Sequence, residues 1–133
     1  MSDAGTPIPL VKLSGEVERA PAPDNYWRED VFVFGNIVNI GTAPTTAADQ
    51  VWGSLILGNT VIAQQHENLD NPPLEANGGS RNVAFKFEGQ YMAVADDWQL
   101  SISITNADGS PSDDGRTPVF SVKAREGQDA PSF

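Results

Sequence analysis

The chain has 133 residues, of which 39% are apolar, and this fits one domain with a single core. Lys and Arg number 8, Asp and Glu number 18, and the formal charge is therefore −10. An acidic chain without a basic run is not expected to bind nucleic acid or an anionic membrane surface. The absence of cysteine excludes disulfides and thiolate chemistry, and no apolar stretch approaches the roughly 20 residues of a membrane-spanning helix, so we expect no membrane insertion.

The N-terminus reads Met-Ser-Asp-Ala-Gly and lacks a basic stretch followed by an apolar one. We therefore expect no signal peptide. The chain is then made inside a cell, belongs to a virion, or is secreted with its signal removed. We expect a single domain over residues 1–133, with flexible tails near residues 1–7 and 126–133.

The first part of the chain predicts two strands. Apolar and polar residues alternate over residues 11–18, which is typical of a strand with one buried face. The sequence Ala-Pro-Ala-Pro-Asp at residues 20–24 then interrupts the chain. Residues 30–40 are apolar on both sides and predict a central strand that is covered on both faces for part of its length.

The middle of the chain predicts a hairpin followed by a loop. Residues 50–57 form one strand, a Gly-Asn pair makes the turn, and residues 60–63 return. The stretch 64–80 carries a Pro-Pro and a Gly-Gly pair without a helical period and is expected to be a loop. It holds the only histidine, His66, for which we expect an exposed position and no catalytic role, because no nucleophile or orienting group is placed around it.

The last part of the chain contains the clearest alternation. Residues 83–88 and 98–105 each place large apolar side chains on one face and polar side chains on the other. Residues 106–118 are rich in turn formers and predict a connector. Residues 117–125 predict the final strand, in which Pro118 indicates a strand start or a sheet edge.

About seven strands and no clear helix predict an all-β fold. We expect a single antiparallel immunoglobulin-like β-sandwich, with a closed β-barrel or a jelly roll as the alternative. The tryptophans Trp52 and Trp98 lie in predicted strands, and we expect both in the core.

One strand ending resembles that of a known family. Domains of the CARDB type (cell-adhesion-related domains) have a strand that ends in Val-x-Asn-x-Gly and is followed by small residues. The stretch from Ile37 to Ala43, which contains Asn39 and Gly41, resembles this ending. The later matching pieces are Leu55 to Asn59, Leu74, Gly79-Ser80, and Val83 to Phe87, so that the resemblance covers residues 30–124. It implies an immunoglobulin-like fold in which the Asn side chain bonds loop backbone and the Gly permits positive φ. We therefore expect this pair to end a strand and not to bind a ligand.

The stretch from Asn106 to Gly115 is the candidate metal site. Asn106, Asp108, Asp113 and Asp114 carry the oxygen ligands that Ca²⁺ prefers. The stretch lacks the spacing and the terminal Glu of an EF-hand loop, and the same residue types also build turns. A calcium site and a solvated connector both remain open, and we expect no other cofactor.

The candidate ligand-binding residues are Tyr26 and Trp27. This pair can stack on a sugar ring or anchor a protein contact, or Trp27 can cover one end of the sandwich. Enzymatic activity is not expected, because no nucleophile–base arrangement or phosphate-binding loop is present. Two functions remain: a structural or protein-binding subunit that associates with a protein partner or with itself, and a carbohydrate-binding module, assisted by Ca²⁺ or not.

Overall fold

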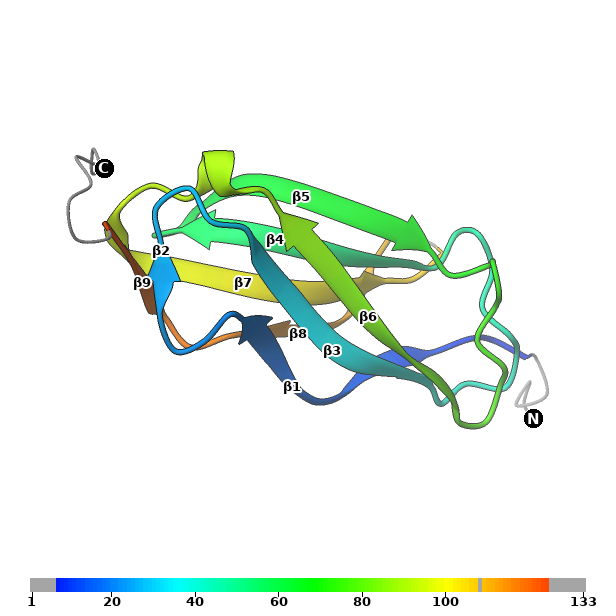
Figure 1. The fold of residues 1–133 in the computed structure, drawn as a ribbon. Helices are drawn as coiled ribbons and strands as arrows, with labels where there is room; N and C mark the ends of the chain where they lie inside the picture. The colour runs from blue at the N-terminus through cyan, green and yellow to red at the C-terminus, as the bar shows by residue number, and fades with distance from the viewer. Residues whose placement is uncertain (1–6, 108, 125–133) are drawn as a thin grey trace.

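The computed structural model of the protein describes residues 7–107 and 109–124. Two sheets pack face to face (Figure 1). The smaller sheet has the order β1-β3-β6, with β1 at Val11–Ala20, β3 at Val31–Asn39 and β6 at Gly79–Phe87. The larger sheet has the order β2-β9-β7-β4-β5, and β8 also pairs with β7. Its strands are β2 (Asn25–Tyr26), β4 (Gln50–Leu57), β5 (Thr60–Asn68), β7 (Ala95–Thr105), β8 (Pro111–Arg116) and β9 (Phe120–Lys123).

The predicted all-β sandwich is confirmed, and the barrel alternative is not, because the two sheets do not close on each other. The strands pair antiparallel, apart from the two-residue parallel pairing of β2 with β9. A short 3₁₀ turn covers Gly89–Tyr91. No helix in the described ranges is long and apolar enough to cross a membrane.

Two predicted loops are wrong in their boundaries. Residues 111–116, predicted as part of a connector, form β8, because Ser101 to Thr105 of β7 provide it with a partner strand. The return strand β5 continues to Asn68, so His66 lies in a strand and not in a loop. Both corrections come from pairing with a distant or neighbouring strand, which outweighs weak local β-propensity.

The core lies between the sheets and uses the predicted alternation. Trp98, Leu100, Ile102 and Ile104 of β7 are completely buried, as the pattern of residues 98–105 predicts. They face the buried side chains of the smaller sheet, which are Val11, Val17, Val31, Val33, Ile37, Val83, Phe85 and Phe87.

The outer face of β3 differs from its prediction. β3 is indeed the central strand of its sheet, and its inward residues Val31, Val33 and Ile37 are buried. Its outward residues Phe32 and Phe34 are 39% and 36% exposed, however. The double-sided apolar pattern therefore reflects one buried face and one partly exposed aromatic face.

Asn39 ends β3 by binding three separate pieces of backbone. Its Oδ1 accepts hydrogen bonds from the nitrogens of Leu10 and Gly41, each at 3.0 Å. Its Nδ2 donates to the carbonyls of Ala43 at 2.8 Å and of Leu74 at 3.2 Å. The side chain is fully buried, so its role is to satisfy backbone groups where the strand leaves the sheet.

Gly41 is needed for a reason other than the expected one. Its φ is not positive; instead, the backbone of residues 8–10 crosses directly over its Cα. A Cβ at this position would overlap the Ile8 carbonyl oxygen and the Leu10 nitrogen. The glycine therefore permits close backbone approach.

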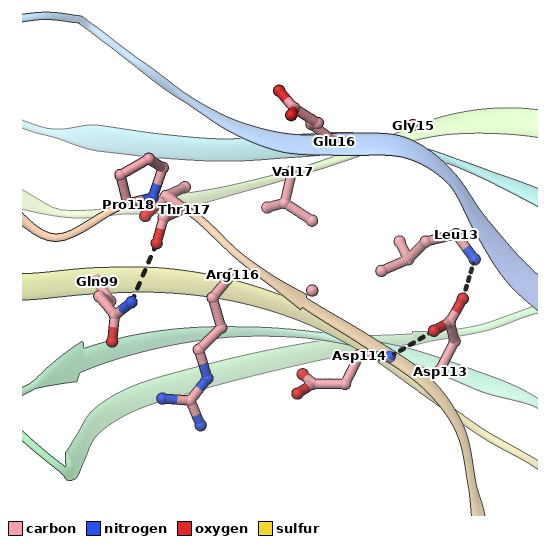
Figure 2. A pocket seen from close by; sticks show the side chains of 11 residues that line it. Leu13, Gly15, Glu16, Val17, Gln99, Asp113, Asp114, Arg116, Thr117 and Pro118 are labelled. Carbon is pink, nitrogen blue, oxygen red and sulfur yellow. Dashed lines mark hydrogen bonds between the residues drawn. The ribbon is translucent and has the colours of Figure 1, made fainter.

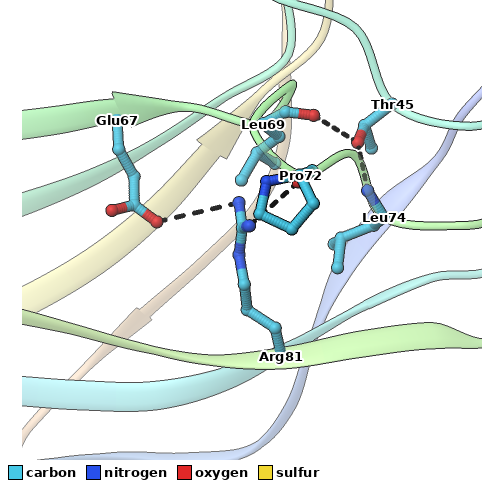
Figure 3. Close-up of polar contacts among 6 residues, drawn as sticks. All are labelled: Thr45, Glu67, Leu69, Pro72, Leu74 and Arg81. Atoms are coloured by element: carbon cyan, nitrogen blue, oxygen red, sulfur yellow. Dashed lines mark hydrogen bonds and ion pairs between the residues drawn. The ribbon is translucent and has the colours of Figure 1, made fainter.

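A second set of polar contacts holds the loop between β5 and β6 (Figure 3). The buried Thr45 hydroxyl donates to the Leu69 carbonyl and accepts from the Leu74 nitrogen at 2.7 Å. Arg81 of β6 donates to the Pro72 carbonyl at 3.0 Å and lies 3.8 Å from the Glu67 carboxylate of β5. The loop is therefore bonded to the connection between β3 and β4 and to β6 of the smaller sheet.

Thr45→Val is expected to lower the free energy of unfolding by about 2 kcal/mol, because it leaves the buried Leu74 nitrogen without its acceptor. Urea unfolding monitored by the fluorescence of the buried Trp98 measures this change. Thr60→Val, at an exposed site in β5, is the matched control and should change stability by less than about 0.5 kcal/mol. Equal stability of the two variants would contradict the role assigned to the Thr45 hydroxyl.

Candidate functional site

The predicted pair Tyr26 and Trp27 lies at one end of the larger sheet. Tyr26 belongs to β2, and the Trp27 nitrogen donates to the Lys123 carbonyl of β9 at 2.8 Å. Both side chains are half-buried. The guanidinium carbon of Arg28 lies 4.6 Å from the centroid of the Trp27 ring, a cation–π contact. The two aromatic residues are neighbours at a partly exposed site, and Arg28 is placed over the tryptophan ring.

Arg19 braces the segment that leads into this pair. Its Nε donates to the Asn25 side-chain oxygen at 2.9 Å, and its Nη2 donates to the Pro23 carbonyl at 2.7 Å. Its guanidinium carbon lies 4.4 Å from the centroid of the Phe120 ring. Burial lowers the pKa of the Arg19 guanidinium below its usual value, but arginine stays charged at neutral pH. Its three contacts give it a structural role in holding β2 in place.

The predicted metal ligands lie on the β7–β8 hairpin. Asn106 binds Ser110 across the turn through its backbone nitrogen at 2.8 Å and through its side-chain amide at 3.2 Å. Asp108 lies outside the described residues. The described ranges contain no group of three or more Asp, Glu or His side chains placed to hold a metal ion. Calcium binding at this hairpin stays a prediction.

Asp113 and Asp114 point to opposite sides of β8, because they are consecutive strand residues. Asp113 Oδ2 accepts from the Leu13 nitrogen of β1 at 2.7 Å, and its Oδ1 accepts from the Asp114 nitrogen at 3.0 Å. Asp114 lies opposite Ser103, on the outer face of the larger sheet. Figure 2 shows Asp113 turned toward β1 and Asp114 turned away. The structure therefore does not bring these two carboxylates together.

The β1–β8 groove is the hollow between these two strands, and it has a volume of about 630 Å³ (Figure 2). Hydrogen bonds connect the two strands at one end of the groove. They are made by Lys12, Ser112 and Asp113 and are called the clasp below. Lys12 Nζ donates to the Ser112 carbonyl at 2.7 Å, and Ser112 Oγ donates to the Val11 carbonyl at 3.0 Å. Beyond this clasp the strands separate, and the groove opens toward Thr117 and Pro118.

A bulge in β1 forms the upper wall of the groove. Ser14 pairs with Asn36 of β3 and Glu18 pairs with Phe34, so residues 15–17 stand against the single residue Gly35. A bulge of this kind leaves strand backbone without its regular partner. The exposed side chain of Glu16 lies at the rim, whereas Val17 turns inward and is buried. The groove therefore has irregular strand backbone on one side.

Gly115 of β8 forms the floor of the groove. A Cβ at this position would lie 2.8 Å from Leu13 Cδ1 and 2.9 Å from Val17 Cγ2. The floor is therefore apolar and closely packed, while the rim carries Glu16, Asp114 and Arg116. Sequence reasoning missed this site, although an isolated Gly in a run of polar residues can indicate close packing.

Asp113→Ala is expected to open the clasp between β1 and β8. It removes the acceptor of the Leu13 nitrogen, so hydrogen exchange of the Leu13 amide should become at least about tenfold faster, which corresponds to about 1.4 kcal/mol. NMR-detected exchange measures this rate. Asp114→Ala is the neighbouring control and should leave the Leu13 amide unchanged. The same rate in both variants would contradict the clasp.

Trp52 does not lie in the core as expected. It lies opposite Ser103 of β7 and His66 of β5, and all three face outward from the larger sheet. The Trp52 and His66 rings are stacked, with centroids 4.5 Å apart and an interplanar angle of 27°. This separation matches the spacing of neighbouring strands, so the two rings stand side by side on the sheet. An aromatic pair therefore stands among polar side chains, where the sequence predicts an isolated loop histidine and a core tryptophan.

No protein-family model matches the chain, and no curated protein matches it in sequence. Many solved structures resemble it in fold. One is β-glucuronidase 2 of Bacteroides uniformis, with a TM-score of 0.63, 10% identity and coverage of 85% of this chain. This chain spans 15% of the length of that enzyme. The C-terminal domain of wzt matches with a TM-score of 0.56 and 16% identity, over 91% of this chain and 80% of that domain.

This chain folds as an immunoglobulin-like β-sandwich. The matches also include the CARDB domain of the PF1109 protein from Pyrococcus furiosus, with a TM-score of 0.49 and 10% identity. That match covers 87% of this chain and 88% of that domain. At these identities the likeness describes the fold alone.

The polar groups singled out in the sequence make structural contacts here. His66 is stacked on Trp52, and Asp113 is engaged by backbone nitrogens of β1 and β8. The β1–β8 groove offers an apolar floor, irregular backbone and a charged rim. These are features of a surface that accepts an extended chain.

Proposed function

We propose that the chain is a non-enzymatic protein-binding module, an immunoglobulin-like subunit of a larger assembly such as a virion decoration or an adhesive surface structure. The observation that supports this function is the β1–β8 groove, which lies between edge strands of the two sheets. Edge strands present backbone groups that can pair with a strand of another protein. An extended segment of the partner lies in the groove and pairs with the bulged backbone of β1.

The charges at the rim of the groove indicate which side chains the partner segment carries. Three carboxylates, those of Glu16, Asp113 and Asp114, line the groove together with the single cation Arg116. A basic side chain of the partner is therefore favoured beside Glu16 and Asp114, and an acidic one is repelled. The partner segment is extended, with small apolar side chains toward Gly115 and basic ones toward the rim.

A peptide titration tests this function. An eight-residue peptide of alternating Val and Lys is added to ¹⁵N-labelled protein at low salt, and an alternating Val and Glu peptide is the control. Amide shifts are expected at Gly15, Val17 and Gly115 with the basic peptide only, and Glu16→Gln should weaken them. The absence of shifts at these three residues, or equal shifts with both peptides, would count against the groove.

Carbohydrate binding is the second candidate, and the outward Trp52–His66 stack favours it. An aromatic ring among hydroxyl and amide side chains suits a sugar ring, which needs a flat apolar contact and hydrogen-bond partners. Tyr26 and Trp27 form the other proposed contact, and Ca²⁺ at the β7–β8 hairpin is the proposed aid to binding. Of the sequence-predicted ligands Asn106, Asp108, Asp113 and Asp114, the ion would use only one of the last two, because these point to opposite sides of β8.

Tryptophan fluorescence during titration with a panel of mono- and oligosaccharides, with and without Ca²⁺, tests this second function. Saturable quenching that Trp52→Ala abolishes assigns the sugar to the sheet face, and loss in Trp27→Ala assigns it to the β2 end. A requirement for Ca²⁺ would support the hairpin ligands. No quenching by any sugar would contradict the second function and leave the protein-binding proposal in place.

A further inference from the structure

β5 is a long and exposed edge of the larger sheet. It pairs with β4 on one side, and no described strand pairs with its other side. Seven of its nine residues are exposed, and Val61 is 50% exposed. Figure 1 shows β5 on the side of the sandwich away from β1 and β8. Nine residues at the rise of a strand present about 30 Å of edge.

The other described edges are shorter, are already engaged or carry basic residues. β2 has only two residues, and β1 and β8 are joined by the clasp of Lys12, Ser112 and Asp113. β6 carries Arg81 and Lys86, and its Lys86 carbonyl accepts a hydrogen bond from the Gln65 side chain. Basic residues and capped carbonyls protect an edge against pairing. Among the described strands, β5 is thus the long edge that is open to pairing.

The composition of β5 gives this edge little protection. Its sequence, Thr-Val-Ile-Ala-Gln-Gln-His-Glu-Asn, contains no Pro, Gly or Lys, and its one acidic residue is Glu67. A bulge at Ile62 interrupts the pairing with β4, since Leu55 pairs with Ala63 and Ile56 pairs with Val61. The regular edge therefore extends from Ala63 to Asn68.

Contacts with neighbouring strands hold this regular edge in position. Besides the Trp52–His66 stack, Gln64 Nε2 donates to the Ser54 hydroxyl at 3.0 Å, and Gln50 Nε2 donates to the Asn68 side-chain oxygen at 3.0 Å. An edge that is already ordered loses little conformational entropy when another strand binds. β5 is therefore already ordered in the conformation that pairing with another strand requires.

We propose that β5 pairs antiparallel with β5 of a second copy of this chain, across a two-fold axis near Gln65 or His66. Along the regular edge, the side of the backbone that does not face β4 offers both N–H donors and C=O acceptors to a second antiparallel strand. Such an edge is complementary to itself, as a two-fold interface requires. An axis at Gln65 or His66 also keeps the two Glu67 side chains from lying directly opposite each other.

The net charge of the chain disfavours this dimer, but the regular edge of β5 itself carries little of that charge. Each chain carries −10, so two copies repel each other over a distance that salt shortens. The regular edge contributes only one formal charge, that of Glu67, which lies 3.8 Å from Arg81. Dimerisation should therefore strengthen as salt increases. The inference goes beyond the proposed function, because it uses a surface separate from the β1–β8 groove.

Solution mass by light scattering, over a wide range of concentration and at two salt concentrations, tests the dimer. The wild type is expected to form a discrete dimer that becomes tighter at high salt. Gln64→Glu replaces the amide that donates to Ser54 Oγ with a carboxylate that can accept from the Ser54 hydroxyl. It also places two charges near the axis, one from each copy, and should weaken the dimer about fivefold at low salt. Gln90→Glu adds the same charge at an exposed site away from β5 and should have a smaller effect. Equal weakening by both variants would contradict the β5 interface.

Single cysteines locate the axis in this cysteine-free chain. Facing residues near the axis are close enough for a disulfide, so Gln65→Cys or His66→Cys should form an oxidised dimer faster than Val119→Cys, which is exposed in the loop before β9. Equal crosslinking at all three sites, or a monomer under every condition, would overturn the inference. Either result would leave the groove proposal standing, because the peptide titration tests it independently.

Discussion

Asn39→Ala is expected to be among the most destabilising single substitutions in the sandwich. It removes four hydrogen bonds, and the backbone nitrogens of Leu10 and Gly41 and the carbonyl of Ala43 lose their partner. The Leu74 carbonyl loses one bond and keeps the one from the Thr45 nitrogen. Each unpaired buried group costs roughly 1–3 kcal/mol, so we expect a loss of about 4 kcal/mol in the free energy of unfolding. That is a large part of the roughly 5–15 kcal/mol typical of a small domain. Urea unfolding followed by tryptophan fluorescence measures it.

Two further variants separate this role from a general effect of losing an asparagine. Asn36→Ala removes an exposed amide pair with Asn82 from the same strand and should reduce stability by less than about 1 kcal/mol. Asn39→Asp keeps the acceptor for Leu10 and Gly41 but loses the two donors and buries a charge, so it should destabilise strongly as well. An Asn39→Ala protein as stable as Asn36→Ala would contradict the assigned role.

The sequence predicts the strands that have one buried face. In β7, the alternation of Trp98, Leu100 and Ile102 with polar residues is a direct consequence of the two-residue period of a strand. The role of Asn39 in ending β3 is predictable for a similar reason, because a short amide side chain bonds nearby backbone. Local geometry is sufficient in both cases.

The predictions that are wrong concern segments that become strands by pairing with the preceding strand. Residues 111–116 contain Pro, Ser, Asp and Gly, whose own preference is for turns, yet they form β8 because β7 offers a ladder of hydrogen bonds. Likewise β5 reaches Asn68 because β4 continues to pair with it. These strand pairings cannot be predicted from the composition of the two segments alone.

The same limit applies to the candidate site. Composition groups Asp113 and Asp114 as calcium ligands, but a strand sends consecutive side chains to opposite faces. Asp113 then binds the nitrogen of Leu13, a residue one hundred positions away. The β1–β8 groove exists only because β1 and β8 lie side by side, and no local pattern in either segment indicates it.

Gly53→Ala is expected to destabilise the sandwich by about 2 kcal/mol, because a Cβ at this position would overlap the ring of Phe85 from the opposite sheet. Gly53 faces inward, and its missing side chain makes room for this phenylalanine. Its neighbour Trp52 consequently faces outward, which is why the expected core position of Trp52 is wrong. Thermal unfolding by circular dichroism measures the loss.

A double substitution decides whether this contact is the cause. Phe85→Ala alone should destabilise, because it removes buried apolar volume, but it also removes the Cγ and Cδ2 atoms that the methyl group of a Gly53→Ala variant would overlap most closely. The double variant Gly53→Ala/Phe85→Ala should therefore be at least about 1 kcal/mol more stable than the sum of the two single effects predicts. Strict additivity would show that Gly53 and Phe85 are not coupled. The packing of the two sheets would then not explain why strand β4 presents its tryptophan to the outside.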